Sequence, residues 1–316
     1  MRDDDGTHVP WQAEYLTPTD RLMHRIDRVL AVETTEYQRM QVVVSATFGK
    51  VLILDGSWQS TQADEFIYHE TLVHPAMLGC RTLPTKVLIL GGGEGATARE
   101  VLRWRSVERC VMVDIDGQVV EACRRHLPEF HCGAFDDPRL EVVIGDAREY
   151  VANTTERWDV VLSDLSDPIE HGPSFQFFTR EYFAQVRDLL ADGGVFALQA
   201  GPASEVDHAS FTRLLTTVRA ELRHADPMRV SIPSFATPWG IIVAARHGLA
   251  HLDDPAAIDA LLHEQVRGPM RFVDGPMLRA VRTMPPAFRA RLAREVEPYT
   301  LADPPKISDV RGIAIN

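Results

Sequence analysis

Carboxylate residues in the middle of the chain are spaced so that they could act together on a positively charged ligand. Each closely follows a short apolar segment: Glu94, Asp114, Asp146, Asp164 and Asp167. In an open α/β sheet, ligands bind beyond the carboxyl ends of the strands. Crowded carboxylates there can create a base or jointly hold a polycation. Each acid also has a structural explanation, since carboxylates cap helices and turns, and for Asp146 we give the two explanations equal weight.

The glycine-rich stretch 91–95 has the spacing of a cofactor-binding turn. Gly91, Gly93 and Ala96 fit the pattern G-x-G-x-x-G/A, directly after the apolar run 87–90. Such a turn lets the backbone come close to a ligand at a helix N-terminus. The motif therefore predicts a nucleoside-containing cofactor without specifying which one.

Two acids narrow the choice of cofactor. Asp114, about 20 residues after the turn, suits a ribose diol. Glu94 would lie among the backbone N–H groups that a pyrophosphate needs, so it disfavours a dinucleotide and favours a cationic ligand. This argues against a dehydrogenase.

Other chemistries find little support in the sequence. His69 and His74 are five residues apart, about 140° around a helix, so they cannot share a metal as an H-E-x-x-H pair does. We expect no metal site. The four cysteines show no C-x-x-C pairing and are interpreted as reduced thiols of a cytoplasmic protein: Cys80, Cys110, Cys123 and Cys132.

The bulk properties are those of a soluble globular chain. Its 316 residues could hold two domains, and its net charge of −12 argues against nonspecific nucleic-acid binding. The acidic N-terminus lacks the apolar core of a signal peptide, and no apolar run approaches the ~20 residues of a membrane span. We therefore expect neither a nucleic-acid nor a membrane partner.

Alternating strand and helix patterns must position these residues. Short alternating segments with a hairpin-type Asp55-Gly56 predict a small antiparallel sheet near the N-terminus, followed by a helix over 64–78. Beyond it, repeated strand–helix units predict a doubly wound α/β sheet. The expected organisation is a flexible N-terminus (1–17), an N-terminal β-domain with a connecting helix (18–80), a Rossmann-like catalytic domain (81–248) and a helical C-terminal extension packed on it (249–316).

With these residues laid out, the chain resembles the spermidine/spermine synthase family, the polyamine aminopropyltransferases. The matching motifs occur in the family's order. They are Tyr37-Gln38, Leu54-Asp-Gly-x-x-Gln59, Asp64-Glu-Phe-Ile-Tyr68-His69-Glu70, Gly91-Gly-Gly-Glu94-Gly, Asp114-Ile-Asp116, Gly145-Asp146-Ala147 and Asp164-x-x-Asp167-Pro168. Four further stretches, 164–176, 199–203, 233–240 and 272–275, look most like thermospermine synthase within the family.

The resemblance implies a Rossmann-like methyltransferase-type domain and a homodimer or homotetramer. It also implies decarboxylated S-adenosylmethionine as donor and methylthioadenosine as product. Donor contacts are expected from Gln38, Gln59, Gly91, Gly92, Gly93, Glu94, Asp114, Asp146, Ala147 and Pro173. Amine contacts are expected from His69, Glu94, Asp164 and Asp167, with Asp164 as proton acceptor. Tyr68, Gln199, Phe235 and Trp239 are expected to line the acceptor channel.

Departures from the family pattern bear on the acceptor. Many members carry aspartate where this chain has Glu94, and spermidine synthases commonly have a tyrosine near the position of Phe235. The loop after Asp167 is also longer and adds Glu170 and His171. These differences favour spermidine as the acceptor, giving a tetraamine such as thermospermine.

Three alternatives stay open. One is a spermidine synthase acting on putrescine or agmatine. Another is an S-adenosylmethionine-dependent methyltransferase, which would share the sheet and the ribose acid. The third is a polyamine-binding protein without catalysis.

Overall fold

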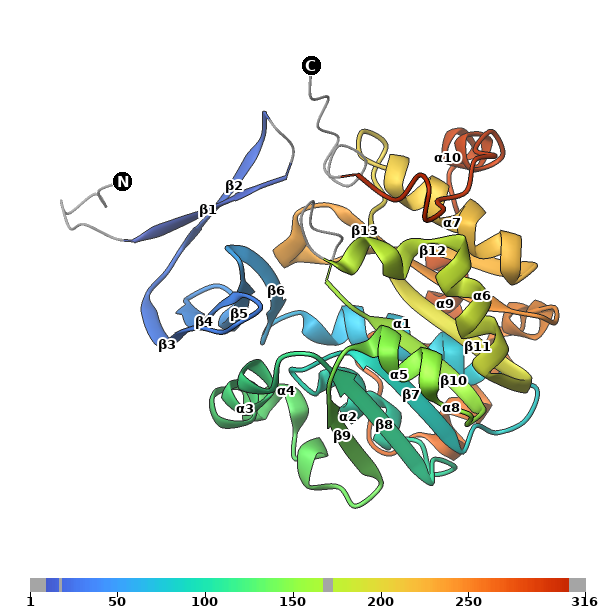
Figure 1. Cartoon of the computed structure of the whole chain (residues 1–316), viewed down its shortest axis with the longest axis horizontal. Helices are drawn as coiled ribbons and strands as arrows, with labels where there is room; N and C mark the ends of the chain where they lie inside the picture. Colours follow the sequence, from blue (N-terminus) through green and yellow to red (C-terminus); the bar gives the residue numbers. More distant parts are fainter. Residues whose placement is uncertain (1–9, 17–18, 167–172, 307–316) are drawn as a thin grey trace.

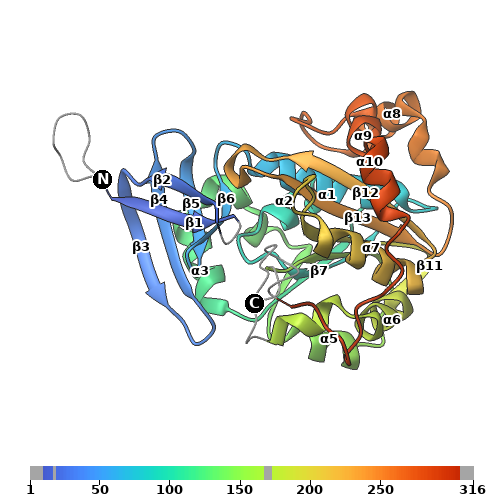
Figure 2. The ribbon, with the colours of Figure 1, turned by 90° about the horizontal axis from the view of Figure 1, so that it is seen from above.

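Two antiparallel sheets form the N-terminal part of the protein. They are seen in a computed structural model that describes residues 10–16, 19–166 and 173–306. Both sheets lie to one side of the large central sheet (Figures 1 and 2). The smaller one pairs β1 (Trp11–Tyr15) with β2 (Arg21–Arg25), and the larger has the order β3 (Arg28–Thr34), β4 (Arg39–Ser45), β5 (Gly49–Leu54), β6 (Ser57–Thr61).

The first of these strands lies within the segment 1–17, which the sequence predicts to be flexible, and gives residues 11–15 a regular structure. Residues 11–15 pair along their whole length with β2, from Trp11 opposite Arg25 to Tyr15 opposite Arg21. Gln12 also donates a hydrogen bond to the Gly56 carbonyl, 2.8 Å away. The order of this segment comes from a partner strand, which its own composition does not reveal.

The predicted hairpin is confirmed. Asp55 and Gly56 join β5 to β6 with φ of +47° and +85°, as a two-residue turn with two left-handed residues requires. Apolar side chains of β4 and β5, among them Met40, Val42 and Leu52, pack against a helix of the next domain that carries Val119. The β-domain is thus attached through a shared core.

The central sheet has seven strands in the order β12, β13, β11, β10, β7, β8, β9. The five strands from β11 to β9 are parallel, whereas β13 runs antiparallel to both β11 and β12. This is the predicted α/β class with a methyltransferase-type sheet. The strands are β7 (Lys86–Gly91), β8 (Arg109–Asp114), β9 (Leu140–Ile144), β10 (Trp158–Asp164), β11 (Leu190–Pro202), β12 (His224–Ser231) and β13 (Pro238–Ala245).

Helices cover both faces of this sheet, which explains the unbroken apolar strand sequences. Val87 and Ile89 of β7 belong to one core, while Leu88 and Leu90 belong to the other. The first core includes α1 (Glu65–Gly79), α2 (Ala96–Leu102), α8 (Pro255–Gln265) and α9 (Gly275–Val281). The second includes α5 (Ala147–Asn153), α6 (Arg180–Leu189), α7 (Ala209–Glu221) and α10 (Pro286–Leu292).

Short helices complete the fold. After β8 come α3 (Gly117–His126), α4 (Pro128–His131) and the 3-10 turn η1 (Ala134–Asp136). Three further 3-10 turns are η2 (Pro173–Phe178), η3 (Pro233–Phe235) and η4 (Ala250–Asp253). The described part of the C-terminal extension therefore consists of η4, α8, α9 and α10, and it contributes to both cores of the catalytic domain, as Leu278 and Phe288 show.

Candidate active site

The glycine turn and Asp164 lie against each other at the carboxyl edge of the sheet. Asp164, the last residue of β10, pairs in register with Gly91, the last residue of β7. Gly91 has φ of +82°, and a Cβ there would lie 2.2 Å from the Asp164 carbonyl oxygen, so only glycine fits. The Gly92 N–H donates to that same oxygen at 3.0 Å. Two motifs more than 70 positions apart thus share one corner of the site.

The Asp164 carboxylate is held by two hydroxyl groups from different helices. Tyr68 of α1 donates a hydrogen bond to Oδ1 at 2.6 Å. Thr97 of α2 donates to Oδ2 at 2.5 Å. A carboxylate oxygen has two lone pairs, so each oxygen can still accept a hydrogen bond from an amine. The sequence identified Tyr68 and Asp164 but gave no reason to single out Thr97.

Glu94 lies beside the next residue of α1. Its Oε1 is 2.8 Å from His69 Nε2, and both side chains are buried. The other ring nitrogen, Nδ1, lies 2.9 Å from Oε2 of Glu65. Burial lowers the pKa of His69, but the two carboxylates outweigh this and raise it to about 10. Glu65 lies in the motif 64–70, which was the only sequence signal for its role.

Neighbouring residues on one helix therefore contact the two acids. Tyr68 reaches Asp164 and His69 reaches Glu94, with the two rings 4.9 Å apart. These acids end or follow different strands, and α1 brings them into one cluster.

Asp114 ends the neighbouring strand β8 and faces the glycine turn. A Cβ on Gly93 would lie 2.8 Å from Asp114 Oδ2, so the absence of a side chain there permits the close approach. Burial raises the pKa of Asp114 to about 6, and the nearby charges of Asp116 and Asp164 act in the same direction. Hydrogen bonds from the backbone of Asp116 and Gly93 oppose this.

Gln38 of the N-terminal domain contacts Asp116 in the described structure. Its Nε2 donates to Asp116 Oδ2 at 3.1 Å, and the Thr35 hydroxyl donates to the same oxygen at 2.6 Å. The other Asp116 oxygen caps α3 by accepting from the N–H groups of Gln118 and Val119. Asp116, part of the motif 114–116, thus joins the two domains next to Asp114.

Asp146 caps the N-terminus of α5, which is the structural role that the sequence offered as an alternative to ligand binding. Its Oδ1 accepts from the Arg148 N–H at 2.7 Å, and its Oδ2 forms an ion pair with the Arg148 guanidinium at 2.8 Å. Burial raises the pKa of Asp146, but these contacts dominate and lower it. Ala147 is buried as the first residue of α5. Capping does not exclude ligand binding, and the donor contacts expected here stay predictions.

An aromatic group borders the Tyr68–Asp164 pair. The rings of Phe235 and Trp239 lie 4.8 Å apart, and those of Tyr68 and Phe235 lie 6.4 Å apart. Trp239 Nε1 donates to Gln199 Oε1 at 3.2 Å, and Gln199 Nε2 donates to the Leu165 carbonyl at 2.8 Å. The four expected channel residues are therefore linked to one another and to the segment after Asp164.

An unpredicted acid fixes the turn that carries Phe235. Asp64 is buried and accepts from the Ser234 N–H at 2.7 Å and from the Ser234 hydroxyl at 3.0 Å. Thr61 also donates to it at 2.6 Å. Asp64 thereby connects the start of α1 to η3, and its only sequence signal was its place in the motif 64–70.

The remaining expected residues are less informative. Gln59 lies on β6, where its side chain donates to the Ser57 carbonyl at 3.2 Å. Pro173 begins η2. Asp167, Glu170 and His171 lie outside the described residues.

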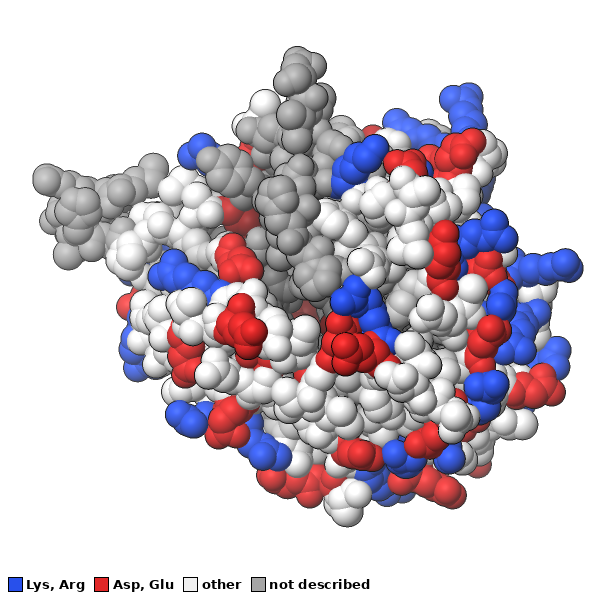
Figure 3. Space-filling model, viewed as in Figure 1, with Lys and Arg blue, Asp and Glu red and all other residues white. Residues whose placement is uncertain are grey.

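Three further observations concern metal-binding groups, membrane spans and surface charge. Over residues 10–16, 19–166 and 173–306 there is no group of three or more His, Cys, Asp or Glu side chains able to hold a metal ion. Within the same ranges, no helix is long and apolar enough to cross a membrane. On the face shown in Figure 3, basic and acidic side chains are interspersed along the lower and right-hand edges.

The fold is a methyltransferase-type α/β domain. At the carboxyl edge of its sheet, where ligands bind in such folds, it carries carboxylates beside the glycine turn, and a nucleotide phosphate would need anion-binding groups there. Comparison with known proteins resolves this further. Residues 65–253 match the spermine/spermidine synthase domain, and residues 10–62 match the spermidine synthase tetramerisation domain. The chain belongs to the spermine/spermidine synthase family, as the sequence motifs indicated, and is a transferase.

Individual relatives cover nearly the whole chain. A polyamine aminopropyltransferase of Synechococcus sp. (strain JA-3-3Ab) is 47% identical over 94% of this chain and 97% of its own. One from Aeropyrum pernix is 44% identical over 92% of this chain and 93% of its own.

Solved structures agree. A spermidine synthase in complex with the transition-state analogue AdoDATO is 30% identical with a TM-score of 0.82, covering 90% of this chain and 95% of that one. Spermidine synthase from Thermotoga maritima is 29% identical with a TM-score of 0.81, covering 91% and 95%.

Proposed function

We propose that the protein transfers the aminopropyl group of decarboxylated S-adenosylmethionine to an amine of spermidine, forming a tetraamine such as thermospermine and releasing methylthioadenosine. One observation carries the proposal: adjacent residues of α1 contact two acids that end or follow different strands. Tyr68 contacts Asp164 and His69 contacts Glu94, so the two acids lie in one cluster. Two carboxylates beside a glycine turn suit a donor and an acceptor that are both cationic.

The chemistry explains why acids suffice. An amine nitrogen attacks the carbon next to the donor's sulfonium, the carbon–sulfur bond breaks, and its electron pair stays on sulfur as a neutral thioether. The leaving group is already good. The difficulty is the amine, because an amine with pKa near ~10.4 is protonated at pH 7, and freeing its lone pair costs about 4–5 kcal/mol.

Asp164 is the proposed proton acceptor that meets this cost. Tyr68 and Thr97 orient its carboxylate, and each oxygen keeps a lone pair for the attacking amine. Holding the amine in line with the sulfonium carbon adds proximity to base catalysis. Asp167 would hold a second nitrogen of the acceptor.

The other acids, Asp114 and Glu94, are the proposed contacts of the donor. Asp114, ending β8 beside Gly93, is available to the ribose hydroxyls. Glu94 is available to the ammonium end of the aminopropyl group. An intact S-adenosylmethionine would instead bring its own carboxylate toward Glu94, and like charges repel. This supports an aminopropyltransferase over a methyltransferase.

The acceptor is inferred from the aromatic group. Phe235 packs edge-on against Trp239 without a hydroxyl to receive a short diamine's second ammonium. The apolar wall instead suits the methylene chain of a longer amine.

An amine panel tests the proposal directly. Purified protein is mixed with decarboxylated S-adenosylmethionine and either spermidine, putrescine or agmatine, and methylthioadenosine and the new polyamine are quantified by mass spectrometry. Release with spermidine alone supports the proposal. Release only with putrescine or agmatine refutes the acceptor, and no release with any amine refutes the function. Reactions with S-adenosylmethionine test the methyltransferase alternative.

We also propose a cytoplasmic homotetramer. The N-terminal residues match a tetramerisation domain, and β1 to β3 expose the apolar side chains Trp11, Met23, Val29 and Val32. Covering such a face is a common reason for association. Light scattering after size exclusion should give four times the mass of the chain, and a monomer would contradict the proposal.

A further inference from the structure

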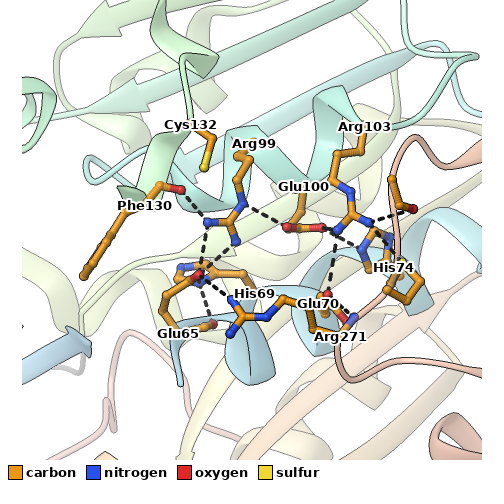
Figure 4. A network of polar contacts seen from close by, with 12 residues as sticks. Glu65, His69, Glu70, His74, Arg99, Glu100, Arg103, Phe130, Cys132 and Arg271 are labelled. Carbon is orange, nitrogen blue, oxygen red and sulfur yellow. Dashed lines mark hydrogen bonds and ion pairs between the residues drawn. The ribbon is translucent and has the colours of Figure 1, made fainter. Parts of the chain in front are cut away.

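A network of buried charges lies behind the site and joins α1 to α2. Figure 4 shows most of its charged members, among them Glu65, His69, Arg99, Glu100 and Arg103. The part nearest the site runs from Arg99 through Glu65 and His69 to Glu94. Arg99 and Glu65 are not among the residues expected to contact a ligand. Both are nevertheless connected, through His69, to Glu94, which is expected to bind the donor.

His69 is the central member of this chain of contacts. Its Nδ1 lies 2.8 Å from the Glu65 carbonyl oxygen and 2.9 Å from Glu65 Oε2, and its Nε2 faces Glu94 Oε1 at 2.8 Å. A neutral imidazole has only one N–H, so it would turn a lone pair toward one of the carboxylates. The imidazolium form presents an N–H to both. With both nitrogens engaged and only 2% of the residue exposed, His69 acts on the site through Glu94.

Arg99 fixes the far end. Its NH1 and NH2 groups donate to the two Glu65 oxygens at 3.1 and 2.8 Å, the bidentate geometry that a planar guanidinium provides. NH1 also donates to the Phe130 carbonyl at 2.5 Å, and Nε donates to Glu100 at 2.9 Å. Held at three points, Arg99 fixes Glu65, and Glu65 in turn fixes the His69 ring.

We propose that Arg99 and Glu65 are positioning residues that hold His69 against Glu94, so that Glu94 is oriented to receive the terminal ammonium of the donor's aminopropyl group. This rests on the proposed function. It differs from the expectation that His69 itself meets an amine.

The state of Glu94 supports this role. Its Oε1 is buried and lies 2.8 Å from His69 Nε2, but the angle of this contact is poor for a hydrogen bond. Among the described residues, Oε1 has no well-aligned hydrogen-bond partner. A buried carboxylate oxygen that keeps hydrogen-bonding capacity is costly unless a ligand uses it. The charges facing His69 are Glu65 from its own helix and Glu94 from the glycine turn, while Arg99 of α2 acts through Glu65 and Tyr68 contributes a ring.

The other half of the network provides a matched control. Glu100 contacts His74 at 2.9 Å and Arg103 at 2.6 Å. Glu70, fully buried, lies 3.7 Å from Arg103 and accepts hydrogen bonds from the backbone N–H groups of residues 271–273. Arg103 is thus an arginine one turn beyond Arg99 with comparable ion pairs. Most of its contacts lead to the C-terminal extension, and among the described residues it has no contact with Glu65 or His69 except indirectly, through Glu100 and Arg99.

The test compares two ligands on three variants of the full-length protein. Decarboxylated S-adenosylmethionine carries the aminopropyl ammonium and the sulfonium charge, and methylthioadenosine carries neither, so the ratio of their dissociation constants reports on the binding of the cationic aminopropyl-sulfonium part of the donor. Calorimetry is done on wild type, Arg99→Lys, Glu65→Gln and Arg103→Lys. Lysine keeps the charge but cannot make the bidentate contact. Circular dichroism and thermal unfolding show which variants are folded. The test can be made with either Arg99→Lys or Glu65→Gln if only one of them folds.

We expect Arg99→Lys and Glu65→Gln to weaken binding of decarboxylated S-adenosylmethionine about tenfold, with binding of methylthioadenosine changed less than about twofold. Arg103→Lys should lower thermal stability and leave the ratio unchanged. An unchanged ratio in Arg99→Lys and Glu65→Gln, or an equal change in Arg103→Lys, overturns the inference. Failure of the wild-type protein to turn over any amine would refute the proposed function instead. That result comes from the turnover assay, which is separate from these binding measurements.

Discussion

The phenolic hydroxyl of Tyr68 donates a 2.6 Å hydrogen bond to Oδ1 of Asp164, although 96 positions separate the two residues. One belongs to the helix that leaves the N-terminal domain and the other ends a central strand of the catalytic sheet. A carboxylate held this way does not have to be ordered when a ligand arrives. The cost of fixing its rotamer has been met by folding.

Removing that hydroxyl should slow the reaction without weakening donor binding. In Tyr68→Phe, we expect kcat to fall about tenfold, because Asp164 loses one of two orienting hydrogen bonds. The dissociation constant of methylthioadenosine should stay within about twofold of wild type. Thr97→Val removes the other hydroxyl and should act similarly, whereas Thr97→Ser keeps it and should be close to wild type. Wild-type kcat in both Tyr68→Phe and Thr97→Val would contradict the orienting role.

Replacing the proposed base itself should have a larger effect. Asp164→Asn keeps the size of the side chain but cannot accept a proton, so methylthioadenosine release should fall by about 10²–10⁴-fold. Donor affinity measured by calorimetry should change little. A variant that turns over at the wild-type rate would remove Asp164 from the mechanism.

The environment of Asp114 predicts a pH dependence of donor binding. Burial raises the pKa of this carboxylic acid to about 6. Above that pH it is ionised and a strong acceptor for ribose hydroxyls, and below it the group is neutral and binds them less well. The affinity for methylthioadenosine should therefore rise about tenfold from pH 5 to pH 7. Asp114→Asn should bind more weakly and lack this rise, and a wild-type affinity that does not vary over this range would contradict the assignment.

His69 predicts a pH dependence of stability with the opposite sign. Despite burial, which alone would lower it, contact with Glu65 and Glu94 raises the pKa of His69 from 6.5 to about 10. The native state then holds its proton more tightly than the unfolded chain, so the stabilisation is complete below pH 6.5 and is lost as the pH rises toward 10. Within that window the slope for one proton is at most about 1.4 kcal/mol per pH unit. Urea unfolding of wild type and His69→Gln at several pH values measures the difference, which should shrink with rising pH, and a constant difference would refute it.

The sequence predicted the strand ends well and the partners of buried charges poorly. Asp114 and Asp164 follow apolar runs, and in a parallel sheet such residues must reach the ligand edge. The glycine pattern before Glu94 likewise depends on local backbone geometry. These features are encoded within short segments.

Glu65, Thr97 and Arg99 were missed for the converse reason. Each gains its role from a residue on another element: Glu65 and Arg99 through the packing of α1 against α2, and Thr97 through the contact of α2 with the end of β10. A charged residue in a helix usually faces solvent, so type and spacing alone give no signal. The strand Trp11–Tyr15 was missed similarly, because the ladder with β2 orders it.

The carboxylate of Glu70 gives the site an unusual dependence on the order of synthesis. Its backbone donors begin at Arg271, 201 positions later in the chain. A ribosome makes α1 long before these donors exist, and a fully buried carboxylate without them would be costly. The helix that carries Tyr68 and His69 therefore reaches its final packing only when the C-terminal segment has emerged. A nascent chain that ends with the synthase domain match at residue 253 still lacks the backbone N–H groups that donate to the Glu70 carboxylate.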